Sequence, residues 1–140
     1  MGFRKMAALS TMLAVIFSAP GCASEADQYP FEDVVNEVIT SYGLDPVEVQ
    51  FADLDGYRLG MVECMIIGDH TNECTVSFDY CVFELEEYIQ QNIAVHEAAH
   101  YVNAQINRRY DHGGLWQRLV RENGQRPIEV YEHWATEECD

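Results

Sequence analysis

The sequence is poor in positive charge. Eight Lys and Arg residues stand against 24 Asp and Glu, which gives the 140-residue chain a formal net charge of -16. A surface of this sign repels phosphate backbones, so we expect no nucleic-acid partner and weakly favour basic or neutral peptides as ligands. The same charge also serves solubility. The chain has no internal repeat and no low-complexity tract, and its length is that of one domain.

A long apolar run is also missing. The most apolar segment, Met6 to Phe17, covers 12 residues, whereas a membrane-spanning helix needs about 20. It follows the basic pair Arg4 and Lys5 and precedes the small residues of "SAPGCAS". A basic start, a short apolar run and small residues make the three-part pattern of a secretory signal. We therefore predict a signal peptide over residues 1–23.

A lipoprotein signal over residues 1–21 is the alternative, because Gly21-Cys22 resembles the end of a bacterial lipobox. Ala19 and Pro20 depart from that pattern, where Leu and then Ala or Ser are usual. A lipid on Cys22 would attach the protein to a membrane. In either case we expect an exported domain over residues 24–140, which is secreted, periplasmic or anchored as a lipoprotein of a bacterial cell envelope.

The chain contains no C-x-x-C pair, which excludes a zinc ribbon and a thioredoxin-type motif. After cleavage the remaining cysteines are Cys64, Cys74, Cys81 and Cys139. An even set in a small exported domain indicates two disulfides, for which three pairings exist. A hairpin turn at Gly68 to His70 sets Ile67 opposite Thr71 and Cys64 opposite Cys74. This register predicts the pairs 64–74 and 81–139.

Hydrophobic periodicity predicts a small α+β domain. The expected elements are a helix over 30–43, strands over 47–54, 57–67 and 74–80, a polar loop over 68–73, a long helix over 82–108 and a short helix over 115–123. We expect a minimal zincin-like arrangement, in which a small, mostly antiparallel sheet accompanies an N-terminal helix, a long active-site helix and a short C-terminal helix.

The long helix carries "HEAAH" from residue 96 to 100. His96 and His100 are one turn apart on the same face, close enough to share a metal ion. An apolar stripe of Val95, Ala99, Val102 and Ile106 lies on a separate face, which we expect to bury against the sheet.

Zinc hydrolase chemistry requires these residue types. Neutral imidazoles bind Zn²⁺, and a catalytic site uses three protein ligands plus a water whose pKa the metal lowers. In the H-E-x-x-H pattern the two histidines are ligands, and Glu97 is the base that takes the proton from the zinc-bound water. His112 follows after eleven intervening residues, and Gly113-Gly114 would let the chain reverse and bring this third histidine to one zinc ion.

"HEAAH", eleven residues and then "HGGLWQRL" together resemble the SprT-like zinc metallopeptidases, whose pattern is HExxH followed by HGxxW or HGxxF. The resemblance implies zinc ligands at His96, His100 and His112, a general base at Glu97, and an aromatic residue, Trp116, packing under the third ligand. It covers residues 82–120 firmly. This chain differs from the best-known members in its predicted export, its acidic charge and its lack of C-terminal zinc-ribbon cysteines. The DNA-linked role of those members is therefore not carried over.

The sequence therefore predicts an exported, zinc-dependent metallopeptidase that acts on a protein or peptide substrate. Two alternatives are an inactive zinc-binding interaction module of the envelope and a disulfide-stapled structural lipoprotein without metal. Among other candidates, His70 is expected to be solvated and His133 to lie on the surface. Tyr101, Tyr110 and Tyr131 are candidates to donate a hydroxyl to a tetrahedral intermediate, with packing as the alternative role.

Overall fold

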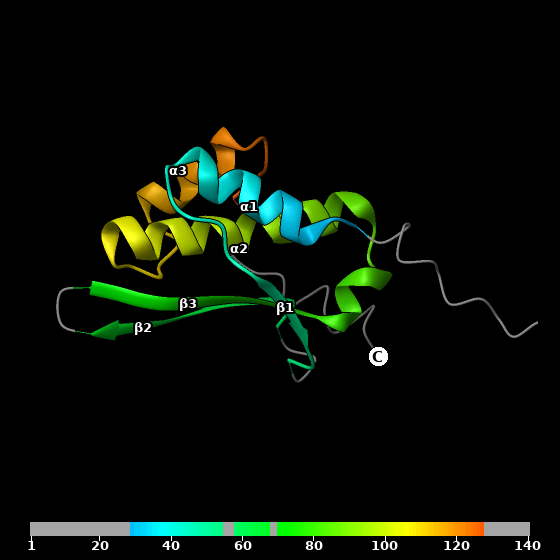
Figure 1. Ribbon diagram of the computed structural model, residues 1–140. Coiled ribbons are helices and arrows are strands. Elements are labelled where there is room, and N and C mark those ends of the chain that lie inside the picture. Colours follow the sequence, from blue (N-terminus) through cyan, green and yellow to red (C-terminus); the bar gives the residue numbers. More distant parts are fainter. Residues whose placement is uncertain (1–28, 55–57, 68–69, 128–140) are drawn as a thin grey trace, which may run out of the picture.

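The computed structural model describes residues 29–54, 58–67 and 70–127 (Figure 1). In chain order, the elements are α1 (Phe31–Ser41), β1 (Val49–Ala52), β2 (Gly60–Ile67), β3 (His70–Asp79), the 3₁₀ helix η2 (Tyr80–Glu84), α2 (Glu87–Asn107) and α3 (Gly114–Glu122). The described residues thus form a small α+β domain, which confirms the predicted fold class. Residues 1–28 and 128–140 lie outside the described residues. The predictions for these segments, including the signal sequence and Cys22, therefore stay predictions.

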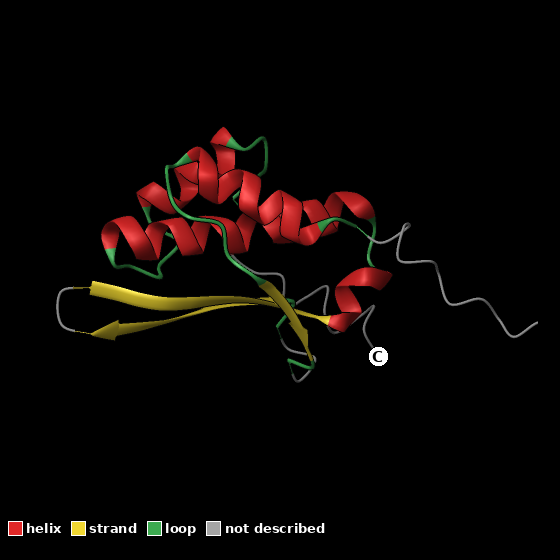
Figure 2. Ribbon diagram, viewed as in Figure 1, coloured by secondary structure: helices red, strands yellow, loops and turns green. Residues whose placement is uncertain are grey.

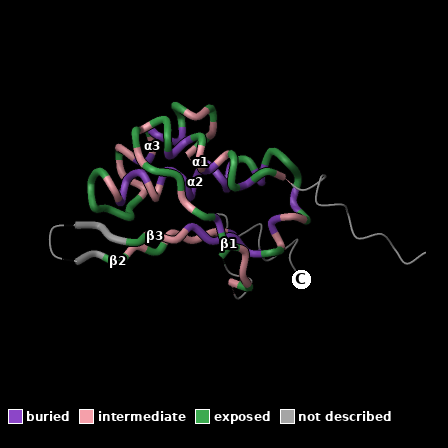
Figure 3. The backbone as a smooth tube through the Cα atoms, in the orientation of Figure 1, coloured by how far each residue is buried: buried purple, intermediate pink, exposed green. Residues whose placement is uncertain are grey.

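Helices α1, α2 and α3 lie on one face of the sheet, with α2 between the sheet and the α1–α3 layer (Figures 1 and 2). Helix α1 packs along α2, and α2 contacts both β2 and β3. Buried residues follow these contacts along the centre of the molecule (Figure 3). The largest fully buried side chains include Phe31, Ile39, Phe78, Ile93 and Trp116. No helix in the described ranges is long and apolar enough to cross a membrane.

The sheet is mixed, with the strand order β1-β3-β2. The long strands β2 and β3 pair antiparallel, whereas the short strand β1 joins β3 in parallel, with Val49 opposite Val76. The sheet is therefore mostly antiparallel, as predicted, and the β1–β3 pairing is its parallel part. Among the described strands β2 lies at an edge, and no other described strand pairs with its outer side.

The predicted polar loop over 68–73 is wrong over residues 70–73, because β3 already begins at His70. Ile67 pairs with His70, and not with Thr71 as the sequence register predicted. The register then shifts by one residue at Glu73, which has a left-handed φ of 47°. A β-bulge of this kind inserts one residue into one strand.

The bulge brings Cys64 opposite Cys74, and the two form the predicted disulfide. The correct pairing thus arises from a turn one residue shorter than expected, combined with a bulge that compensates for it. Cys139, the predicted partner of Cys81, lies outside the described residues, so the 81–139 pairing stays a prediction.

The predicted long helix starts too early. Residues 82–84 belong to η2, Leu85 is extended with ψ 159°, and α2 begins at Glu87. The Asp79 carboxylate caps η2 by accepting a hydrogen bond from the Cys81 N–H at 2.9 Å. Val82 and Leu85 are both buried. No glycine or proline marks this break in the sequence. The burial of Val82 and Leu85 and the capping by Asp79 interrupt the helix, although the sequence pattern there is helical.

Candidate metal centre

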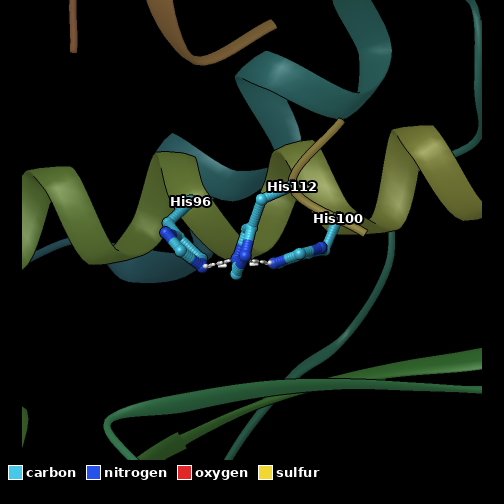
Figure 4. Close-up of side chains that lie close together, drawn as sticks. All are labelled: His96, His100 and His112. Atoms are coloured by element: carbon cyan, nitrogen blue, oxygen red, sulfur yellow. Dashed lines mark hydrogen bonds between the residues drawn. The ribbon is translucent and has the colours of Figure 1, made fainter. Parts of the chain in front are cut away.

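Three imidazoles converge on one point on the sheet side of α2 (Figure 4). The Nε2 atoms of His96 and His100 are 3.1 Å apart, those of His100 and His112 are 3.0 Å apart, and those of His112 and His96 are 3.2 Å apart. His96 is buried, and the other two are half-buried. The structure thus brings together all three ligands that the sequence predicted, and the cluster could hold a metal ion.

The triangle has the size that a small divalent ion requires. A tetrahedral ion with metal–nitrogen bonds of about 2.0–2.1 Å separates its ligand nitrogens by roughly 3.3 Å, close to the distances in the cluster. Each neutral imidazole Nε2 is either a donor or an acceptor, so three mutual hydrogen bonds cannot all form at once. Three nitrogens aimed at one point are instead the donor set that imidazole-binding metals such as zinc, copper, iron and nickel use.

The loop between α2 and α3 carries His112 to the cluster. Helix α2 ends at Arg108, whose left-handed φ of 56° turns the chain back. Asp111 Oδ1 then accepts the Gly113 N–H at 3.1 Å. The sequence assigned the reversal to Gly113-Gly114, but neither residue has a left-handed φ. A Cβ at Gly113 would lie 2.7 Å from Asp111 Oδ1, so a side chain there would displace the carboxylate that accepts the Gly113 N–H.

Two amide side chains hold this loop on the helices. The Asn103 amide donates to the backbone carbonyl of Asp111 at 3.3 Å, and Asn103 is 1% exposed. The Gln117 amide donates to the carbonyl of His112 itself at 3.1 Å. Sequence reasoning missed both residues, because amides carry no metal-ligand signal. They fix the backbone that presents the third imidazole.

Trp116 forms the floor of the cluster, as the resemblance implied. Its ring centroid lies 4.3 Å from that of His112, 4.7 Å from that of His96 and 5.5 Å from that of His100. Its indole N–H donates to the His96 carbonyl at 3.3 Å, and the residue is fully buried. One side chain of α3 therefore packs against all three imidazoles and restricts their rotation.

Glu97 lies beside the imidazoles, in contact with strand β2. Its Oε1 is 4.0 Å from His96 Nε2, and its side chain packs against Gly60. Burial raises the pKa of Glu97 to about 8. A cation held by the histidines would favour the ionised carboxylate and oppose this shift. The site thus has a carboxylate that is largely shielded from solvent next to the three imidazole nitrogens.

Burial and, to a lesser extent, the neighbouring His112 lower the pKa of His100 to about 4. The neutral imidazole is the form that binds metals. The environment of His100 therefore disfavours the protonated state that would compete with an ion.

The apolar stripe of α2 does not face the sheet as predicted. Successive residues of a helix are about 100° apart, so Val95 and Ala99 point roughly 160° away from Glu97, which contacts β2. The stripe belongs to the side of α2 that α1 covers (Figure 1). Val95, Ala99 and Val102 are buried, but Ile106 is 52% exposed, so the buried stripe ends one turn earlier than expected.

The roles predicted for the other candidates stay predictions. His70 is the first residue of β3 and not a loop residue. Tyr110 is 40% exposed and Tyr101 is half-buried. His133 and Tyr131 lie outside the described residues.

No family model, no curated protein and no solved structure matches this chain.

Proposed function

We propose that the protein is a zinc-dependent metallopeptidase. His96, His100 and His112 would hold one Zn²⁺ ion, and Glu97 would act as the general base. The observation that carries the proposal is the convergence of three imidazole Nε2 atoms within 3.0–3.2 Å of one another beside a buried carboxylate. A SprT-like, zincin-type relationship is part of this proposal and rests on "HEAAH" and "HGGLW".

When bound, zinc lowers the pKa of a water molecule and polarises the scissile carbonyl, and three protein ligands leave a coordination position open for this. Glu97 takes a proton from the attacking water and passes it to the leaving amine. Its burial supports that role, because a carboxylate shielded from solvent is a stronger base than an exposed one. Trp116 keeps the imidazoles in one orientation, so little reorganisation accompanies the reaction.

Strand β2 offers a place for an extended peptide. It lies at the edge of the described sheet, and the Glu97 side chain touches it at Gly60. An edge strand presents unpaired backbone N–H and C=O groups, to which a peptide adds as a further strand. A substrate bound this way would pass close to the imidazoles and the carboxylate.

The test combines metal analysis with peptide hydrolysis. Purified protein should contain about one zinc per chain and cleave a casein or peptide-library substrate. Glu97→Gln keeps the size and helix propensity of the side chain but removes the basic oxygen, so zinc content should stay while hydrolysis falls at least about a hundredfold. Glu37→Gln, the same change at an exposed position of α1, is the matched control and should behave as the parent.

Two results would contradict the proposal. A parent protein without stoichiometric metal would favour the structural alternative. A zinc-loaded Glu97→Gln variant that cleaves as fast as the parent would rule out Glu97 as the base.

A further inference from the structure

Strand β2 begins with a glycine that touches the side chain of Glu97. A Cβ built on Gly60 would lie 2.5 Å from Glu97 Cγ and 2.9 Å from both Cδ and Oε1. These separations are far shorter than the contacts of about 3.5–4.0 Å that carbon atoms keep. No residue with a side chain fits at position 60 while Glu97 stays in place.

The backbone does not require glycine at this position. Among the described glycines, Gly43 and Gly124 have a left-handed φ, whereas Gly60 does not. Any L-residue could therefore adopt the conformation of this strand residue. The need for glycine comes from the volume that the Glu97 side chain occupies, and not from a turn.

Both partners of the contact are held in place. Gly60 pairs with Phe78, and the neighbouring Leu59 carbonyl accepts the Asp79 N–H at 3.1 Å. The Asp79 carboxylate in turn accepts the Leu54 N–H at 2.6 Å, which ties this end of the sheet together. On the helix side, only 9% of the Glu97 side chain is exposed. Because backbone hydrogen bonds hold the strand, whereas a glutamate side chain can rotate about its own bonds, an added methyl group at position 60 would displace the Glu97 side chain more readily than the strand.

We propose that Gly60 is a positioning residue for Glu97. Its missing side chain makes the space beside the imidazoles in which the carboxylate lies, and the surrounding strand prevents that carboxylate from moving away from the metal centre. The catalytic consequence rests on the proposed function, whereas the contact itself does not.

The first test is Gly60→Ala, with Gly114→Ala as the matched control. Gly114 begins α3, and a Cβ there would meet nothing within 4 Å. Both variants should keep about one zinc per chain. In Gly60→Ala, kcat should fall about a hundredfold with KM nearly unchanged, since a misplacement of about 1 Å costs this much. Gly114→Ala should match the parent in both constants, and a Gly60→Ala variant that also matches it overturns the proposal.

The second test does not depend on peptide hydrolysis. Co²⁺ replaces the native metal, and its visible absorption spectrum reports on groups next to the ligands. Gly60→Ala and Glu97→Gln should both shift the parent spectrum, and Gly114→Ala should not. If the parent cleaves no peptide, the proposed function fails, but a shared spectral shift still supports the positioning role. A Gly60→Ala spectrum identical to that of the parent overturns it.

A double-mutant cycle isolates the contact from general damage to the strand. Gly60→Ala should lower the urea midpoint of unfolding in the parent, and should lower it much less in a Glu97→Ala background, where the colliding atoms are gone. If Gly60→Ala alone fails to fold, recovery of folding in the double variant supports the contact. Equal losses in both backgrounds would show that Gly60 serves only the strand, and would overturn the proposal.

Discussion

At the scale of single residues, the histidine cluster depends on one histidine that α2 does not carry. His96 and His100 are one helical turn apart by geometry alone, whereas His112 reaches the cluster through a loop held by Asn103 and Gln117. Two imidazoles leave a zinc ion under-coordinated, and affinity falls steeply when one ligand of three is lost.

His112→Ala should therefore purify with little zinc, while the parent holds about one ion per chain. Metal analysis after dialysis measures this directly. Tyr110→Ala is the control, because Tyr110 lies in the same loop, is 40% exposed and is not one of the predicted zinc ligands. Zinc content equal to the parent in His112→Ala would show that another group completes the site.

Sequence reasoning found the residues whose chemistry is specific, and missed those that act through contacts. Histidines and a glutamate at motif spacing identified the cluster, and an aromatic residue at the fourth place after His112 identified its floor. Gly60 gave no such signal, because its role comes from touching Glu97, which lies far along the chain. The sequence placed Gly60 within the predicted strand over 57–67, but it did not show which helix side chain contacts this residue.

At the scale of elements, periodicity located the α-helices and strands of the described residues, but it misplaced their ends and missed the 3₁₀ helix η2. The long helix begins at Glu87 because Val82 and Leu85 both turn into the core before it. The β2–β3 hairpin has a tighter turn than expected and a bulge at Glu73. Two errors of one residue cancelled at the cysteines, so the disulfide was predicted correctly from an incorrect register.

The disulfide connects β2 and β3 across a sequence separation of 10 residues. Loop-closure entropy for a loop of this size corresponds to about 2–3 kcal/mol of stability. The Gln105 amide of α2 also donates to Cys74 Sγ at 3.0 Å, and this contact links the hairpin to α2.

Replacing both cysteines, Cys64→Ser and Cys74→Ser, should lower the free energy of unfolding by about 2–3 kcal/mol in urea titrations. Substitution is preferable to a reducing agent, which would act on the remaining cysteines as well. Zinc content should be retained, since neither cysteine belongs to the histidine cluster. An unchanged urea midpoint would mean that the hairpin is stable without its cross-link.

At the scale of the whole molecule, the dominant property is the net charge of -16. Summed over a domain of this size, such a charge gives a negative potential that raises the local concentration of cations and lowers that of anions. The potential acts on the approach of a substrate before any contact with the imidazoles is made. It therefore affects substrate binding more than the chemical step.

Two peptides with the same scissile segment, one flanked by lysines and the other by glutamates, should accordingly differ in affinity. Binding to the Glu97→Gln variant, followed by fluorescence anisotropy, measures Kd without turnover. At about 0.01 M ionic strength the Debye length is about 30 Å, and at 0.15 M it is about 8 Å. The lysine-flanked peptide should bind about tenfold more tightly at low salt, and most of this advantage should disappear at 0.15 M. A preference that does not change with salt would place selectivity in direct contacts along β2, and tighter binding of the glutamate-flanked peptide would show that the local field at the site opposes the net charge.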